Sequence, residues 1–151
     1  MNIYIDTSAY VKEYHDEPGS ELVHSVFERA KNGEALLIIS LWTISETINT
    51  IDRHFMRHEL NNEEYDNVLG AIFTDMFEML DNKNLKIVDI DTNLVKMSWE
   101  YISSEHLSAA DSLHLVTAMK SNADVFYAAD KKLIGVARKR NLNAVDVEEL
   151  T

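Results

Sequence analysis

The sequence contains no cysteine and, in 151 residues, only one proline and four glycines. The absence of thiols excludes disulfides, thiolate metal ligands and a cysteine nucleophile, and it fits a reducing cytoplasm. So little proline and glycine leaves no room for a flexible linker, and no tandem repeat is visible. We therefore expect residues 1–151 to form a single domain, which at this length buries roughly 70% of the surface that its unfolded chain exposes.

Long apolar runs and basic residues are also scarce. No uninterrupted apolar run is longer than that at residues 35–39, which is too short to cross a bilayer, and the first residues lack the basic cluster of a signal peptide. The net charge is −12, from 14 basic and 26 acidic residues. This charge is unfavourable for non-specific binding to phosphate backbones, although it leaves room for a local basic patch. We expect a cytoplasmic protein with no membrane association.

Short apolar segments alternate along the chain with segments of helical spacing. The apolar segments predicted as strands are 2–6, 35–40, 85–90, 123–129 and 142–147. Between them, apolar residues recur three or four positions apart, and several of these segments begin at residues that favour helix N-termini. This alternation predicts a three-layer α/β/α fold around a mostly parallel sheet of about five strands.

Four acidic residues lie near strand ends or helix starts. Asp6 ends the first strand, and Asp130 follows the fourth. Glu46 lies early in the helix after the second strand, and Asp111 opens the helix that precedes the fourth. Functional residues of open α/β sheets gather beyond the carboxyl ends of the strands. Because carboxylates brought together need raised pKa values or a cation, the pattern predicts a site for Mg²⁺ or Mn²⁺, which prefer oxygen ligands.

Each of these acids also has a simpler interpretation, as the cap of a helix N-terminus or as part of a solvated helix face. Asp91 illustrates this alternative. Residues 90–92 repeat the Ile-Asp-Thr of residues 5–7 at another junction of strand and helix, with no further motif beside them. We interpret Asp91 as an N-cap alone.

Four segments around the acids resemble the PIN-domain nucleases, in particular the VapC-type toxins of toxin–antitoxin pairs. They are IDTSAY around Asp6, SETINTIDR around Glu46, LSAADSLHLVTA around Asp111 and YAADKKL around Asp130. They follow the family's order over essentially the whole chain, and the third is the most specific. The resemblance implies a sheet flanked by helices, a Mg²⁺ or Mn²⁺ site made by the four acids, and hydrolysis of RNA. It also implies a cognate antitoxin and a homodimer.

The resemblance assigns supporting roles as well. Ser8, two residues after the first Asp, matches a position that supports the site in the family, and we place Thr7 with it. The family usually has Thr, Ser or Asn just ahead of the fourth acid, where this chain has Ala128 and Ala129. Asp130 therefore lacks the neighbouring polar side chain that the family usually has beside its fourth acid. This departure leaves open the alternative of a weakly active or non-catalytic RNA-binding or scaffold module on the same fold.

A second alternative is an Asp-based phosphotransfer enzyme, which also places Asp at strand ends. The haloacid-dehalogenase type needs a second Asp two residues after the first, where this chain has Ser8. The receiver type needs an acidic pair before the phosphorylated Asp and a late Lys, and neither stands at the right place. A metal-dependent endoribonuclease therefore explains the motifs better.

Candidates for binding RNA phosphates are Arg53, Lys131 and Lys132, which would form a local basic patch on an acidic body. The same residues would also fit solvated helix faces. His54 and His58 lie four apart, a spacing that can bind zinc, but no third ligand is evident in the sequence and we expect both to be exposed.

Overall fold

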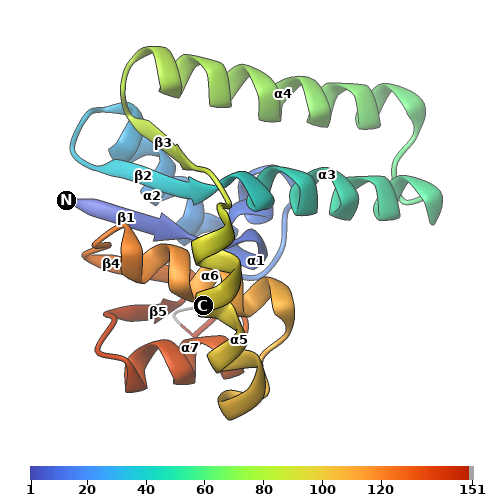
Figure 1. Cartoon of the computed structure of the whole chain (residues 1–151). Coiled ribbons are helices and arrows are strands. Elements are labelled where there is room, and N and C mark those ends of the chain that lie inside the picture. Colours follow the sequence, from blue (N-terminus) through green and yellow to red (C-terminus); the bar gives the residue numbers. More distant parts are fainter. Residues whose placement is uncertain (150–151) are drawn as a thin grey trace.

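A computed structural model describes residues 1–149, which are built around one five-stranded sheet (Figure 1). The strands are β1 (Asn2–Ile5), β2 (Leu36–Ser40), β3 (Leu85–Val88), β4 (Val125–Ala128) and β5 (Ala144–Asp146). All neighbouring strands are parallel, in the order β3-β2-β1-β4-β5. Each strand lies inside a segment predicted as a strand, so the expected α/β fold is confirmed.

Helices connect every strand to the next. They are α1 (Thr7–Tyr10), the 3-10 helix η1 (Val11–Glu13), α2 (Ser20–Lys31), α3 (Leu41–Met56), α4 (Asn62–Asp81), α5 (Thr92–Glu105), α6 (Ala109–Lys120) and α7 (Lys131–Lys139). Among residues 1–149, no helix combines the length and the apolar content that a membrane span requires. Asp91 caps α5 by accepting the Leu94 N–H at 2.8 Å, as predicted.

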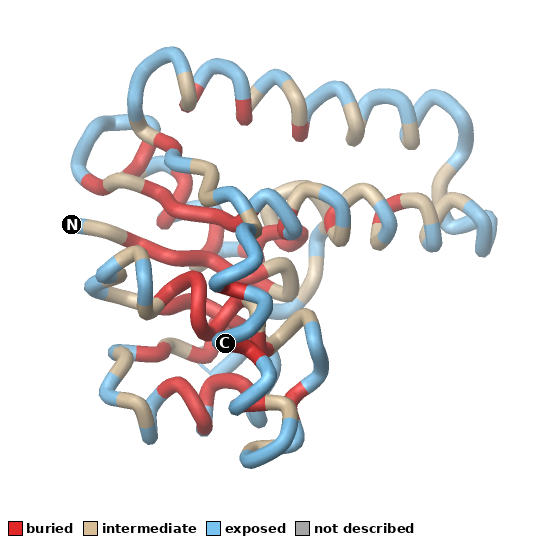
Figure 2. The backbone as a smooth tube through the Cα atoms, viewed as in Figure 1, coloured by how far each residue is buried: buried red, intermediate tan, exposed pale blue. Residues whose placement is uncertain are grey.

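The three central strands, β2, β1 and β4, are buried on both faces (Figure 2), which explains why they are mostly apolar. In β1, Ile3 and Ile5 point into a core shared with α2 and α4, while Tyr4 points into a second core shared with α5, α6 and α7. These side chains are fully buried, and burying each contributes roughly 1.5–3 kcal/mol. The three layers predicted from the sequence are therefore present.

The chain reverses its direction across the sheet between β1 and β4. From β1 it moves outward through β2 to β3, then crosses to β4 and β5 on the other side. Ligands of open α/β sheets bind beyond the carboxyl ends of the strands at such a reversal. The Asp6 N–H donates to the Tyr127 carbonyl at 3.0 Å and so joins the ends of the two strands.

Helices α3 and α4 form a long hairpin that extends past the strand ends (Figure 1). A third core cluster of Val11 from η1, Ile51 from α3 and Ile72 from α4 holds this hairpin to the body of the molecule. The C-terminal half of α3 therefore lies against the segment that joins β1 to α2.

Candidate active site

A cavity of about 390 Å³ lies at the carboxyl ends of β1 and β4. We call it the acidic cavity, because Asp6, Glu46 and Asp111 all line it. Thr7, Ser8, Arg53, Asn49, Thr50 and Ala129 are among its other lining residues. Three of the four predicted acids, both predicted supporting residues and one predicted phosphate-binding residue thus lie in one place.

Asp6 is the most buried of these acids, with a relative exposure of 2%. It directly follows β1 and caps α1, accepting the Ala9 N–H at 3.0 Å. Burial raises the pKa of the Asp6 carboxyl from its ordinary 3.8 to about 6, against the opposing effects of His114, the Ser8 hydroxyl and the Ala9 N–H. A cation in the cavity would favour the ionised form, so Asp6 is suited to hold one.

Ser8 links the ends of the two central strands. Its hydroxyl donates to the Asp6 carboxylate, whose oxygens lie 2.8 and 2.9 Å away, and accepts the Ala129 N–H at 2.8 Å. The second contact needs only a backbone N–H. It is therefore compatible with alanine at position 129, where the sequence departs from the family's usual pattern.

Glu46 lies on α3 at the end of a chain of buried hydrogen bonds. Its Oε2 atom is 2.7 Å from His114 Nε2 and accepts the Thr7 hydroxyl at 2.5 Å. His114 Nδ1 lies 2.9 Å from the Tyr4 hydroxyl. Partial burial acts to raise the pKa of Glu46, but the hydrogen bonds from His114 and Thr7 outweigh it and the pKa is lowered. Glu46 is thus held as a carboxylate, and the buried His114 packs beneath it.

Asp111 is the third residue of α6, where the helix dipole favours negative charge. Ser108 caps this helix: its hydroxyl oxygen accepts the Asp111 N–H at 3.0 Å and lies 2.6 Å from Asp111 Oδ2, to which it donates. Asp111 is partly exposed and faces the acidic cavity. Asp6 therefore caps a helix and also faces the acidic cavity, whereas Asp111 faces the cavity from the first turn of a helix that Ser108 caps.

Asp130, Lys131 and Lys132 do not line the acidic cavity, although Asp130 directly follows Ala129, which does. Asp130 is exposed and caps α7, accepting the Leu133 N–H at 2.7 Å. Lys131 lines a different cavity of about 400 Å³, together with Arg138. Lys132 donates to the His106 carbonyl. Of the basic residues predicted to bind RNA, the structure places only Arg53 beside the three acids.

Lys12 is a residue of the acidic cavity that the sequence does not reveal. Its side chain is only 3% exposed and pairs with Glu17 at 3.0 Å and Glu148 at 2.9 Å. Burial acts to lower the pKa of the Lys12 ammonium, but its hydrogen bonds to these carboxylates outweigh it and the pKa is raised. Local sequence carries no signal for this burial, because Glu148 is 136 positions away.

The model of the PIN domain family matches residues 3–139, a range that contains all four acids. The chain belongs to the PIN domain family. This confirms the resemblance to PIN-domain nucleases that the four acidic segments indicated. No curated protein matches the chain in sequence.

Solved structures share this PIN fold at low sequence identity. VapC20 of Mycobacterium tuberculosis, a sarcin-ricin loop cleaving toxin, is 12% identical with a TM-score of 0.65, over 89% of this chain and 94% of that one. VapBC2 of Rickettsia felis, bound to a DNA fragment from its promoter, is 18% identical with a TM-score of 0.64, over 97% and 98%. FitAcB of Neisseria gonorrhoeae is 13% identical with a TM-score of 0.68, over 96% and 97%. These identities show a common fold.

The donor set of the acidic cavity suits a hard divalent ion. Asp6, Glu46 and Asp111 offer carboxylate oxygens, which Mg²⁺ and Mn²⁺ prefer. Among residues 1–149, these three do not form a group whose ligand atoms all lie within 4.8 Å of one another. This spacing is compatible with Mg²⁺, which usually keeps several waters and is held by one or two carboxylates.

Proposed function

We propose that this PIN domain is a divalent-metal-dependent endoribonuclease that hydrolyses RNA phosphodiester bonds. The observation that carries the proposal is the arrangement of Asp6, Glu46 and Asp111 around one cavity at the point where the strand order reverses. We further propose that residues 1–151 form one PIN domain and that the chain is the toxin of a toxin–antitoxin pair. The structural likeness to VapC20 and VapBC2 supports this role.

Asp6, Glu46 and Asp111 would hold Mg²⁺ or Mn²⁺, directly or through a water. When bound, the ion supplies a more acidic water and positive charge against the phosphate oxygens. Ser8 would keep the Asp6 carboxylate aimed into the cavity, and Thr7 and His114 would do the same for Glu46. Arg53, exposed at the cavity, would bind an RNA phosphate. No side-chain nucleophile is required.

Asp130 keeps its proposed role as a further metal ligand that completes the shell or positions a second ion. Lys131 and Lys132 remain candidates for phosphate contacts farther along the RNA. A protein antitoxin, a homodimer and a cytoplasmic location are proposed from the resemblance to the VapC type.

The proposal is tested by cleavage of labelled RNA with Mg²⁺ or Mn²⁺, with and without EDTA. We expect EDTA to abolish cleavage, and Asp6→Asn and Asp111→Asn each to reduce it by about 100-fold or more, because charge stabilisation at the phosphate is lost. Asp91→Asn is the matched control: Asp91 also caps a helix after a strand but lies outside the acidic cavity. Its activity should stay within about twofold of the wild type.

Cleavage that survives EDTA, or both cavity substitutions, would overturn the metal mechanism. A well-folded wild-type protein that cleaves no RNA with either ion would instead favour the non-catalytic alternative. Circular dichroism of each variant separates loss of chemistry from loss of folding.

A further inference from the structure

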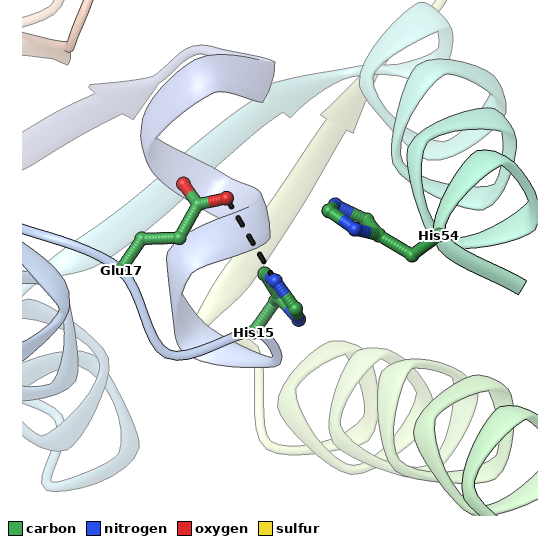
Figure 3. Close-up of side chains that lie close together, drawn as sticks. All are labelled: His15, Glu17 and His54. Carbon is green, nitrogen blue, oxygen red and sulfur yellow. Dashed lines mark ion pairs between the residues drawn. The ribbon is translucent and has the colours of Figure 1, made fainter. Parts of the chain in front are cut away.

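The structure brings together three side chains outside the three acids (Figure 3). His15 and Glu17 lie in the turn between η1 and α2, and His54 lies near the end of α3. Within residues 1–149 this is the only group of three His, Asp or Glu residues whose ligand atoms all lie within 4.8 Å of one another. We call it the histidine cluster.

The histidine cluster corrects the expectation for His54. The sequence predicts that His54 and His58 are both exposed, but the His54 side chain is only 16% exposed. Helix α3 ends at Met56, and His58 follows with a φ of 58°, so the spacing of four does not bring the two rings together on one helix face. His54 instead meets His15, 39 positions earlier in the chain. The two ring centroids lie 4.1 Å apart with the planes tilted by 32°.

Two further residues orient the histidine cluster from outside. Glu59 is hydrogen-bonded to His54 Nδ1, which leaves the Nε2 atom of this ring for other contacts. Lys12 donates to Glu17 Oε2 at 3.0 Å, and Glu17 Oε1 lies 4.0 Å from His15 Nε2. A histidine that binds a metal commonly donates its other ring N–H to a carboxylate, as His54 does to Glu59.

We propose that His15, Glu17 and His54 form a Zn²⁺ site separate from the three acids of the acidic cavity. Two imidazole nitrogens and one carboxylate oxygen are a ligand set that Zn²⁺ accepts, with a water in the fourth position. The carboxylates of the acidic cavity, by contrast, offer only oxygen. Tetrahedral bonds of about 2.1 Å place ligands roughly 3.4 Å apart, so ligand atoms that now lie within 4.8 Å of one another must approach by at most about 1.4 Å on binding.

Zinc at the histidine cluster would connect two parts of the fold that are distant in sequence. It would tie the turn before α2 to the C-terminal part of α3. Glu17 also lines the acidic cavity, so the ion would lie at the rim of that cavity. We therefore expect Zn²⁺ to stabilise the protein at this rim, whatever the protein does to RNA.

The test is a calorimetric titration of the whole protein with Zn²⁺, beside Co²⁺ absorption spectra that report tetrahedral coordination. We expect one Zn²⁺ site, a melting temperature that rises by several degrees with Zn²⁺, and at least a tenfold loss of affinity in His15→Gln and in His54→Gln. His58→Asn is the matched control and should bind like the wild type. Asp6→Asn should also bind Zn²⁺ with wild-type affinity. Because the same variant should lose RNA cleavage, the zinc site and the nuclease activity are tested independently.

Three outcomes would overturn the proposal: no Zn²⁺ binding by the wild-type protein, equal binding by His15→Gln and the wild type, or loss of Zn²⁺ binding in Asp6→Asn alone. The last result would place the ion among the carboxylates of the acidic cavity. His15 lies on a turn and is partly exposed, so His15→Gln should keep the protein folded even if His54→Gln does not.

Discussion

The acidic cavity and the histidine cluster are neighbours that share Glu17, yet they are built in different ways. The cavity takes its form from the sheet: Asp6 directly follows β1, and Ser8 ties it to the backbone at the end of β4. The cluster depends on a turn and on the distant part of α3. Asp6 is therefore placed by a general property of parallel sheets, whereas the histidines meet only because the turn after η1 packs against α3.

The largest stability effect should come from removing the buried support of the acidic cavity. His114→Ala removes a partner of the Tyr4 hydroxyl and a donor to Glu46, and leaves a hole in a core where His114 is 2% exposed. We expect a loss of about 2–4 kcal/mol in the free energy of unfolding, measured by urea denaturation. Zn²⁺ affinity at the histidine cluster should not change. His58→Asn is the surface control, and an effect below about 1 kcal/mol for His114→Ala would show that this network adds little stability.

A smaller effect should appear in the pH dependence of stability without divalent ions. The folded protein holds the Asp6 proton more tightly than the unfolded chain does, since burial raises the pKa from 3.8 to about 6. Ionising Asp6 as the pH rises through this range therefore lowers the free energy of unfolding, by at most about 3 kcal/mol above pH 7. Asp6→Asn should be more stable than the wild type at pH 8, by about 1–3 kcal/mol, and similar to it near pH 3.5.

Asp91 is the control for this pH dependence, because its shift has the opposite sign. The Leu94 N–H and Lys120 lower the pKa of the Asp91 carboxyl, so its contribution to stability is present above the ordinary pKa and is lost on acidification. Asp91→Asn should thus be slightly less stable than the wild type at pH 8. Equal pH profiles for Asp6→Asn and the wild type would show that Asp6 is not desolvated in solution.

The smallest effect is expected at Asp130. Its carboxylate accepts the N–H of Leu133 in its own helix and does not line the acidic cavity. Asp130→Asn should therefore reduce RNA cleavage by less than about tenfold, or about 1.4 kcal/mol, against about 100-fold for Asp111→Asn. Single-turnover rates at saturating Mn²⁺ make the comparison. A small loss fits a peripheral ligand, whereas equal losses in the two variants would show that Asp130 holds the ion as strongly as Asp111 does.

Much of the arrangement of the candidate site could be predicted from the sequence, because the patterns that mark a strand end or a helix start extend over only a few residues. The junction after Ile5 combines the end of an apolar strand with a capping Asp, and Ser8 follows at the family's spacing. Asp111 stands in the first turn of a helix behind small residues. Each acid is thus positioned by its own strand or helix, and a parallel sheet then brings three of them to the same edge.

Other contacts could not be predicted, because they join segments that no local pattern connects. From the sequence, Lys12 would be taken for an ordinary surface lysine. In the structure it is buried in the wall of the acidic cavity, where it pairs with Glu17 and Glu148. The sequence groups Asp130 with the other three acids, and in the structure it caps its own helix and does not line the acidic cavity.

Alone, the sequence determined the alternation of strands and helices, the parallel sheet and the order of the acids. These features follow from hydrophobic period and from capping, which are local. Only the tertiary structure decided that His54 lies beside His15 and Glu17 instead of His58. That contact depends on how Val11, Ile51 and Ile72 pack η1, α3 and α4 together. Packing of this kind is a property of three surfaces at once, and no one segment encodes it.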